Sequence, residues 1–491
     1  MIHKYKIRKT LILLGIIGLI IQSCDTVDFA DTNIDPDATS EPVSNGLLTY
    51  AEKYIGNLVT DELPELWIQH ISEITYTETS RYGTRNYDID TYYTNPLDNL
   101  NLIIELNSNE ETIESQANYG ATVNQLAVAK LLRAYIYQNL TDRWGMLPYS
   151  EALKGLENTT PVFDSQEQIY DNLFTEIDES LQLIDPSLQG PTGDQMFEGN
   201  MDRWILFGNT MKLVMALRLS NVYPEAGGYA ATKFQEAINA GVIGSVNENL
   251  EYPFLTDDNN DSPWQDAFQT REDYAVSDTF IDALLEDEDP RIDEYAEYTD
   301  ASVADDNPKY VGMPYGLTTS EAVADNYSFI KSEIIYDGDF PGIIYTYAQV
   351  LFSYAEAVKL GWISGDANQF YEDAIQASFD QWNASGASDY IDSVSLNNDD
   401  KIAMQQIAYE KWKALYMQGW ESWFEWRRTG YPQLTPAAQP LTGTDIPVRQ
   451  GYDLDWSSSN TVNYDAAIDE QGPDDLSTYV WWDEPHPITG E

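Results

Sequence analysis

The sequence predicts an all-α fold, and three observations lead to that prediction. Long segments lack Gly and Pro and place apolar residues at helical steps, small Ala residues recur among large ones, and helix start and stop signals flank several segments. The clearest segment is 123–140, where Leu126, Ala129 and Leu132 lie on one face of a helix.

Further segments show the same spacing. The segment 166–184 follows a start signal at Ser165 and ends before Pro186, whereas 202–220 is apolar on most sides and is therefore expected to be buried. The remaining predicted helices are 346–360, 368–382 and 401–417. Recurring Ala residues resemble those of stacked helical hairpins such as tetratricopeptide pairs, although no strict 34-residue period is present. Gly, Pro, Asp and Asn punctuate 221–342 and 433–491, which we expect to be long irregular loops.

The N-terminus has the features of an export signal. A basic start precedes the apolar run 11–21, which would span only about 16 Å as a helix, too short for a bilayer core of about 30 Å. Cys24 is the only cysteine in 491 residues and lies where a bacterial lipoprotein is cleaved and lipidated. We therefore predict a signal peptide at 1–23, lipidation of Cys24, an acidic flexible tether at 24–42 and a single domain at 43–491. An ordinary secretory signal with a stray cysteine is the alternative.

The charge restricts the partners. The chain has a net charge of −56, and removal of residues 1–23 would take away basic residues only. Such a charge repels nucleic acid and anionic lipid, so we expect no nucleic acid to bind and a neutral ligand to be preferred. The sequence also contains 34 Tyr and 13 Trp residues, which suit either sugar stacking or ordinary packing.

Several strings together resemble one family. They are residues 140–152 (LTDRWGMLPYSEA), 161–170 (PVFDSQEQIY), 199–220 (GN…W…ALRLS), 289–291 (DPR) and 419–432 (GWESWFEWRRTGYP). In order along the chain, they are similar to the motifs of the SusD/RagB family of glycan-binding lipoproteins, and most closely to its SusD-like 2 subgroup. Met146 replaces a common Asp, and Arg203 replaces the usual Lys.

The resemblance implies both a fold and a function. It implies about four tetratricopeptide-like helical pairs whose long loops carry a glycan site, and no catalysis. It implies anchoring in the outer membrane, facing the cell surface, and a SusC-like TonB-dependent transporter as partner; Asp25 and Asp28, just after Cys24, suit the family's surface-export signal. A neutral glycan, such as the β-glucan laminarin, is the expected ligand.

Two aromatic segments are candidate glycan sites. Aromatic rings alternate with short polar side chains in 67–93, as neutral sugars require. The candidate ligand-binding residues there are Trp67, Tyr76, Tyr82, Tyr87 and Tyr92. Trp264 lies in a polar, acidic segment and is the strongest single candidate for stacking on a sugar. Alternatively, 67–93 forms a Tyr-rich surface hairpin without a ligand.

A third aromatic string is assigned to the core. In a helix covering 420–431, Trp420, Trp423, Phe424 and Arg427 share one face, and Glu425 lies three residues before Arg428. A binding platform would use such a face. We favour an aromatic core contact with an internal ion pair, because the resembling family shares this string across different ligands.

Other chemistries lack the residues they need. One assigned cysteine and few histidines exclude a zinc cluster or Cys/His catalysis, and no phosphate-binding Gly-rich loop is present. Asp257, Asn259 and Asp261 resemble the start of a calcium loop, but Ser262 and Phe268 occupy positions that an EF-hand cannot use. We therefore predict no cofactor and no metal, and leave an irregular structural calcium site open. A lipid-anchored helical glycoside hydrolase and a helical protein-interaction scaffold are the competing functions.

Overall fold

The computed structural model describes residues 42–317, 322–443 and 445–483. Residues Ser44–Glu491 form one compact unit. The predicted signal peptide, Cys24 and nearly all of the predicted tether lie outside the described residues, so these remain predictions. Within the described part, no helix is both long enough and apolar enough to cross a bilayer.

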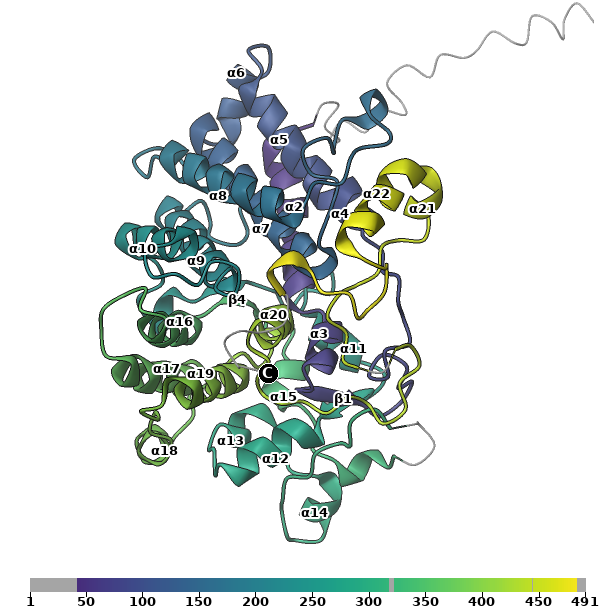
Figure 1. Cartoon of the computed structure of the whole chain (residues 1–491), viewed down its shortest axis with the longest axis vertical. Helices are drawn as coiled ribbons and strands as arrows, with labels where there is room; N and C mark the ends of the chain where they lie inside the picture. Colours follow the sequence, from purple (N-terminus) through teal and green to yellow (C-terminus); the bar gives the residue numbers. More distant parts are fainter. Residues whose placement is uncertain (1–41, 318–321, 444, 484–491) are drawn as a thin grey trace, which may run out of the picture. The chain divides into compact units, whose positions relative to one another are not determined.

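The compact unit is built mainly from helical pairs. α2 (Ser44–Val59) packs against α5 (Asp98–Ser108), and α7 (Thr122–Trp144) packs against α8 (Gln166–Leu183). α9 (Met201–Arg218) pairs with α10 (Tyr229–Ala240), and α16 (Tyr347–Lys359) pairs with α17 (Ala367–Gln381). α19 (Asp400–Ala414) and α20 (Gly419–Thr429) follow. Figure 1 shows three of these pairs stacked in chain order along one side of the unit. The predicted all-α fold of stacked helical hairpins is confirmed, and the six predicted helices match α7, α8, α9, α16, α17 and α19.

Local signals explain where these helices begin and how closely they pack. Ser165 and Gln168 form a reciprocal capping box at the start of α8, and the Asn200 side chain caps α9. α9 is buried almost all round, as its apolar sequence predicts. A Cβ at Gly208 would lie 2.9 Å from Leu181 and 3.0 Å from Leu131, so this glycine allows α9 to approach its two neighbours.

The two regions expected to be long loops contain more structure than predicted. The region 221–342 contains α10, α11 (Pro263–Phe268), α12 (Asp278–Glu286), α13 (Ile292–Tyr295), α14 (Asp300–Ala304) and α15 (Ser332–Ile335). The region 433–491 contains α21 (Trp456–Ser459) and α22 (Thr461–Gln471). A prediction from composition misses these helices because the glycines at their ends are interpreted as loop signals. Gly228 and Gly241, for example, bound α10, whose Ala230, Ala231 and Ala237 are buried.

Two small antiparallel sheets hold the connecting segments to the helices. β1 (Ile71–Glu73) pairs with β3 (Tyr274–Val276), and β2 (Leu250–Tyr252) pairs with β4 (Gly342–Tyr345). Because β1 pairs with a strand about 200 residues away, 67–93 is not a hairpin. This pairing places the segment after β1 beside the segment before β3. The remaining short helices are α3 (Glu62–Trp67), α4 (Asp90–Tyr92), α6 (Ile113–Gln116) and α18 (Ala387–Ser393), with a π-turn at Tyr93–Leu97.

Four of the five family-like strings meet in the core. The Asp142 carboxylate accepts hydrogen bonds from Arg218 at 3.0 Å and from the Tyr170 hydroxyl at 2.6 Å, and its backbone carbonyl accepts one from Arg427 at 2.6 Å. Each of these residues comes from a different string, and all are buried. The strings that carry the resemblance therefore specify how α7, α8, α9 and α20 pack together.

The interpretation of 420–431 as a core contact is confirmed. The side chains of Trp423, Phe424 and Arg427 are at most 2% exposed. The Glu425 carboxylate pairs with Arg428 at 2.6 Å and with Lys411 at 2.7 Å. These cations hold the pKa of Glu425 well below its usual range, against the opposing effect of burial. A buried acid that would be costly alone is thus stable as an ion.

Candidate functional site

Three of the predicted ligand-binding rings are buried. Trp67 packs 5.0 Å from Trp423 between ring centroids, and the Tyr82 hydroxyl accepts a hydrogen bond from the Ala437 backbone at 3.0 Å. Trp264 lies in α11 with only 3% of its surface exposed. A ring must expose a face to stack on a sugar, so the structure places these three in the core, and we leave them out of the site proposed below.

Tyr76 is the most exposed of the predicted rings, at 62%. Its backbone adopts the left-handed conformation, with φ of 58°, and the Arg271 guanidinium lies 5.0 Å from the ring centroid. The β1–β3 pairing produces this contact, because Tyr76 follows β1 and Arg271 precedes β3. A strained backbone that presents an aromatic ring to solvent is common at binding sites.

Tyr87 and Tyr92 are partly exposed and lie near two further tyrosines, Tyr50 and Tyr54, which the sequence analysis did not identify as candidates. On α2, the rings of Tyr50 and Tyr54 lie 5.4 Å apart, and the Tyr50 hydroxyl donates to Asn95 Oδ1 at 3.3 Å. Burial and the hydroxyls of Tyr50 and Tyr92 raise the pKa of Tyr54 to about 12, so that hydroxyl stays neutral. We call Tyr50, Tyr54, Tyr87, Tyr92 and Asn95 the tyrosine surface.

The same face of α2 continues into a polar cavity. Asn57 lies one turn beyond Tyr54, and Asp61 follows one turn later as the cap of α3. The cavity has a volume of about 490 Å³. It is lined by Lys53, Asn57, Thr60, Asp61, Glu62, Asp258, Asn259, Asp261, Pro263 and Asp266, and we call it the acidic cavity. It joins the N-terminal helices to the segment before α11, although the two are separated by about 200 residues of chain.

The electrostatics of the acidic cavity favour a ligand rich in hydroxyl groups. Burial and the neighbouring Glu62 carboxylate raise the pKa of Asp61 to about 7, while Arg143 opposes this shift. The carboxylates accept O–H donors, the Asn amides donate and accept, and the tyrosine rings offer faces for the C–H side of a sugar. An anionic ligand would be repelled, because Lys53 is the only cation among the residues that line this cavity and its Nζ already donates to the Asn259 carbonyl at 2.5 Å.

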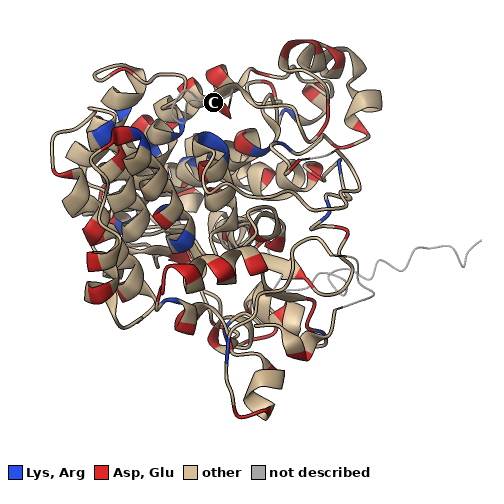
Figure 2. Cartoon of the chain, turned by 60° about the horizontal axis from the view of Figure 1, so that its bottom comes forward, with Lys and Arg blue, Asp and Glu red and all other residues tan. Residues whose placement is uncertain are grey.

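The predicted loop around Asp257 forms a local turn. Its carboxylate accepts hydrogen bonds from the backbone and side-chain amide of Asn259 at 3.1 and 2.8 Å. Among the described residues, no group of three or more His, Cys, Asp or Glu is arranged to hold a metal ion. Figure 2 shows acidic residues spread over the helices and loops of the viewed side rather than gathered on one element.

Comparison with known proteins agrees with the fold. A family model described as "Starch-binding associating with outer membrane" (SusD-like_2) matches residues 36–453. A solved chitin-binding protein is 27% identical with a TM-score of 0.78, covering 90% of this chain and 100% of that one. SusD homologues from Bacteroides fragilis and Bacteroides thetaiotaomicron are each 25% identical with a TM-score of 0.75, covering 91% of this chain and 100% of theirs. Comparison with curated proteins gives no match.

The helical scaffold, with its family-like strings packed into the core, is the fold of these SusD homologues. The chain belongs to the SusD-like 2 family of outer-membrane nutrient-binding proteins. This family binds its ligands without catalysis, which confirms the prediction that the protein is not an enzyme and sets the hydrolase alternative aside.

Proposed function

We propose that the tyrosine surface and the acidic cavity together capture a neutral oligosaccharide or polysaccharide. The observation that carries this proposal is the alignment of Tyr50, Tyr54 and Asn57 along one face of α2, with Asp61 just beyond the end of that helix, so that tyrosine rings lead into the acidic cavity. Sugar rings stack on the tyrosines while their hydroxyl groups bond to the cavity. Tyr76 and Arg271 supply a further exposed contact.

The chemistry of the surface selects a neutral glycan. The net charge of −56 and the carboxylates of the cavity repel uronates and sulfated sugars. A β-1,3-glucan such as laminarin is one candidate. Chitin oligosaccharides are another, because a structural relative at 27% identity is named a chitin-binding protein.

Binding is tested by isothermal titration calorimetry of the full chain in mild detergent against laminarin, chitin, starch and alginate oligosaccharides. We expect saturable heat with a neutral glycan and none with alginate. Replacing Tyr54 with Ala should weaken binding about tenfold, the equivalent of about 1.4 kcal/mol. The control is Tyr479→Ala, whose ring is 44% exposed and lies outside both surfaces.

Three outcomes would overturn the proposal. Equal losses in Tyr54→Ala and Tyr479→Ala would mean that the tyrosine surface is not the site. Heat that continues after mixing would indicate turnover instead of capture. Saturable binding of a peptide, with no heat from any glycan, would favour the alternative of a protein-interaction scaffold.

The proposed role includes delivery as well as capture. We propose that lipid on Cys24 holds the protein at the cell-surface face of the outer membrane, where it passes the glycan to a SusC-like TonB-dependent transporter. Changing Cys24 to Ala should move the protein from the membrane fraction to the soluble fraction while glycan affinity stays unchanged. Affinity purification of the lipidated protein should recover a TonB-dependent barrel in stoichiometric amount; its absence would contradict the delivery step.

A further inference from the structure

A second cavity lies beside the proposed glycan site. Its volume is about 520 Å³, within the range of small-ligand sites. Three segments far apart in the sequence form it. They are residues 90–98, residues 148–161, and α21 together with Asn460, the residue before α22. The lining residues used below are Asp90, Tyr93, Asp98, Asn158, Trp456 and Ser459.

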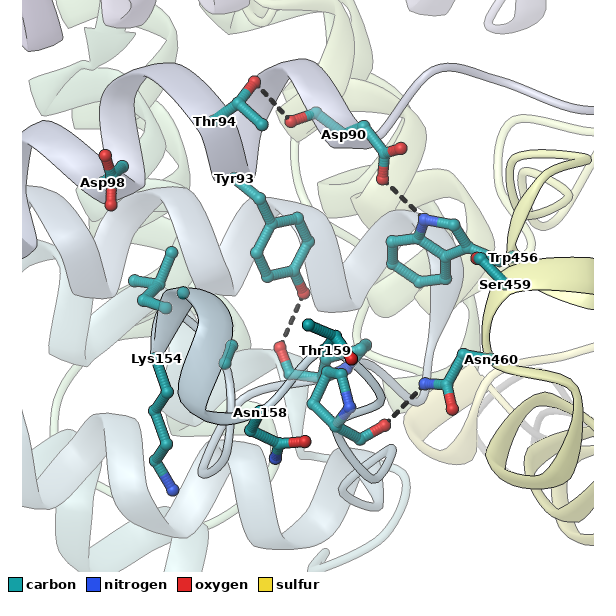
Figure 3. A pocket seen from close by; sticks show the side chains of 15 residues that line it. Asp90, Tyr93, Thr94, Asp98, Lys154, Asn158, Thr159, Trp456, Ser459 and Asn460 are labelled. Atoms are coloured by element: carbon teal, nitrogen blue, oxygen red, sulfur yellow. Dashed lines mark hydrogen bonds between the residues drawn. The ribbon is translucent and has the colours of Figure 1, made fainter.

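Two aromatic rings form one wall of this second cavity. The rings of Tyr93 and Trp456 meet edge to face, with centroids 5.9 Å apart. The Tyr93 hydroxyl donates to the Pro148 carbonyl at 2.6 Å, and Trp456 Nε1 donates to Asp90 Oδ1 at 2.5 Å. Figure 3 shows the Tyr93 ring descending from its helix and the Trp456 indole entering from the facing segment. Because the polar ends are already bonded, each ring is held in place. Tyr93 is partly buried and Trp456 is 9% exposed, so only part of each ring is available to a ligand.

Further aromatic residues and a hydrogen bond hold the Tyr93–Trp456 wall in place. Tyr452 stacks on Trp456 at 5.7 Å between centroids, and Phe163 packs against the indole edge at 5.4 Å. Asn460 donates to the Pro161 carbonyl at 2.7 Å, which ties α21 to the loop on the opposite side of the cavity. A preorganised wall lowers the entropic cost of binding, because its own side chains need not be ordered when a ligand binds.

Polar groups around the rings remain available to a ligand. Within the described chain, the carboxylate of Asp98 and the hydroxyl of Ser459 have no hydrogen-bond partner, and both residues are exposed. The second carboxylate oxygen of Asp90 also accepts no hydrogen bond among the described residues. Rings with bonded polar ends, surrounded by free carboxylate and hydroxyl acceptors, suit a ligand with an apolar ring face and several O–H donors.

The two sites use opposite faces of one helical segment. Asp90, Tyr93 and Asp98 face the second cavity, whereas Tyr92 and Asn95 belong to the tyrosine surface. The π-turn at Tyr93–Leu97 contains Pro96, which lacks the backbone N–H of a regular helix. The helical segment 90–98 is therefore the part of the chain that contributes residues to both the second cavity and the tyrosine surface.

We infer that the second cavity is a separate carbohydrate-binding site that holds one or two sugar units of a neutral glycan between the Tyr93–Trp456 wall and the Asp90 and Asp98 carboxylates. The inference rests on the proposed function, because it assigns the same class of ligand. A glycan bound at both sites would dissociate more slowly than one bound at either site alone.

The test measures binding of laminaritriose and chitotriose to the full chain in mild detergent by calorimetry. Ser459→Trp fills the second cavity, and Ser458→Trp is the matched control, since it adds the same ring one residue away at an exposed position that does not line the cavity. Asp98→Ala removes an exposed carboxylate without touching the core. The double variant Tyr50→Ala/Tyr54→Ala removes the stacking rings of the tyrosine surface.

The expected result is a stoichiometry of two for a trisaccharide that binds. The double tyrosine variant should keep one class of site, which Ser459→Trp weakens at least tenfold, Asp98→Ala weakens severalfold, and Ser458→Trp leaves unchanged. If the double tyrosine variant abolishes all binding and Ser459→Trp leaves wild-type binding intact, the second site is overturned while the proposed function stands. If no trisaccharide binds any form of the protein, both are overturned.

Discussion

The guanidinium of Arg143 donates a hydrogen bond to the Tyr92 hydroxyl at 3.1 Å. The same guanidinium lies 4.0 Å from the ring centroid of Trp420 and donates to Gln450 Oε1 at 2.7 Å. Arg143 lies in the last turn of α7, and Trp420 lies in the first turn of α20. One buried cation thus connects the helical core to the tyrosine surface.

Replacing Arg143 with Lys should test this connection. Lysine keeps the charge but lacks the planar fork that stacks on Trp420 while bonding Tyr92 and Gln450. We expect a loss of about 1–3 kcal/mol in the free energy of unfolding and severalfold weaker glycan binding. Urea denaturation and calorimetry would measure the two effects. The exposed Arg85→Lys is the control, and unchanged affinity in Arg143→Lys would show that Tyr92 needs no such anchor.

Trp264 distinguishes a core role from a ligand role. Trp264→Ala should lower the free energy of unfolding by about 3–5 kcal/mol, because it removes a buried ring. Trp264→Phe should retain most of the stability and all of the glycan affinity. If Trp264→Phe is as stable as the wild type yet binds the glycan tenfold more weakly, Trp264 contacts the ligand, as the sequence predicted.

The buried ion pairs of α20 should contribute strongly to the free energy of unfolding. Arg428 pairs with Glu425 at 2.6 Å and donates to Glu356 Oε2 at 2.8 Å, with no exposed side-chain surface. Arg428→Met leaves both carboxylates buried without this cation and should cost about 3–5 kcal/mol in urea denaturation. Lys130→Met, which breaks a surface pair with Glu179 at 3.3 Å, should cost about 0–1 kcal/mol. Similar costs for both variants would contradict this account.

The pH dependence of stability should report on Asp61. Its pKa is about 7 in the folded protein against an ordinary value of 3.8, so the folded state holds this proton more tightly than the unfolded state. The stabilisation is complete below about pH 3.8 and is lost as the pH rises to about 7. Relative to Asp61→Asn, the free energy of unfolding of the wild type should therefore fall across this interval and stay level above it. A difference that rises with pH would have the wrong sign.

The sequence predicted the long helices well because their signals are local. Apolar spacing in α7 and the Ser165 cap of α8 depend on a few consecutive residues, and the packing of Trp423 and Phe424 follows from one helical face. Burial of Trp264 could not be predicted in this way. Its polar neighbours indicated a loop, whereas the cover comes from a cluster with residues such as Ile334 and Phe280, distant along the chain.

The candidate site shows the same division. Sequence composition pointed to Tyr87 and Tyr92, but Tyr50 and Tyr54 lay in an ordinary amphipathic helix, and nothing local linked them to Asn95. The packing of α2 against α5 and against the π-turn at Tyr93–Leu97 brings these segments together.

By itself, the sequence determined the helical class, the charge that disfavours anionic partners and the strings that build the core, because these depend on composition and on residues within a few helical turns. The tertiary structure decided which rings are exposed and which carboxylates share a cavity. Exposure depends on contacts between residues hundreds of positions apart, and those contacts exist only after the helical pairs have stacked.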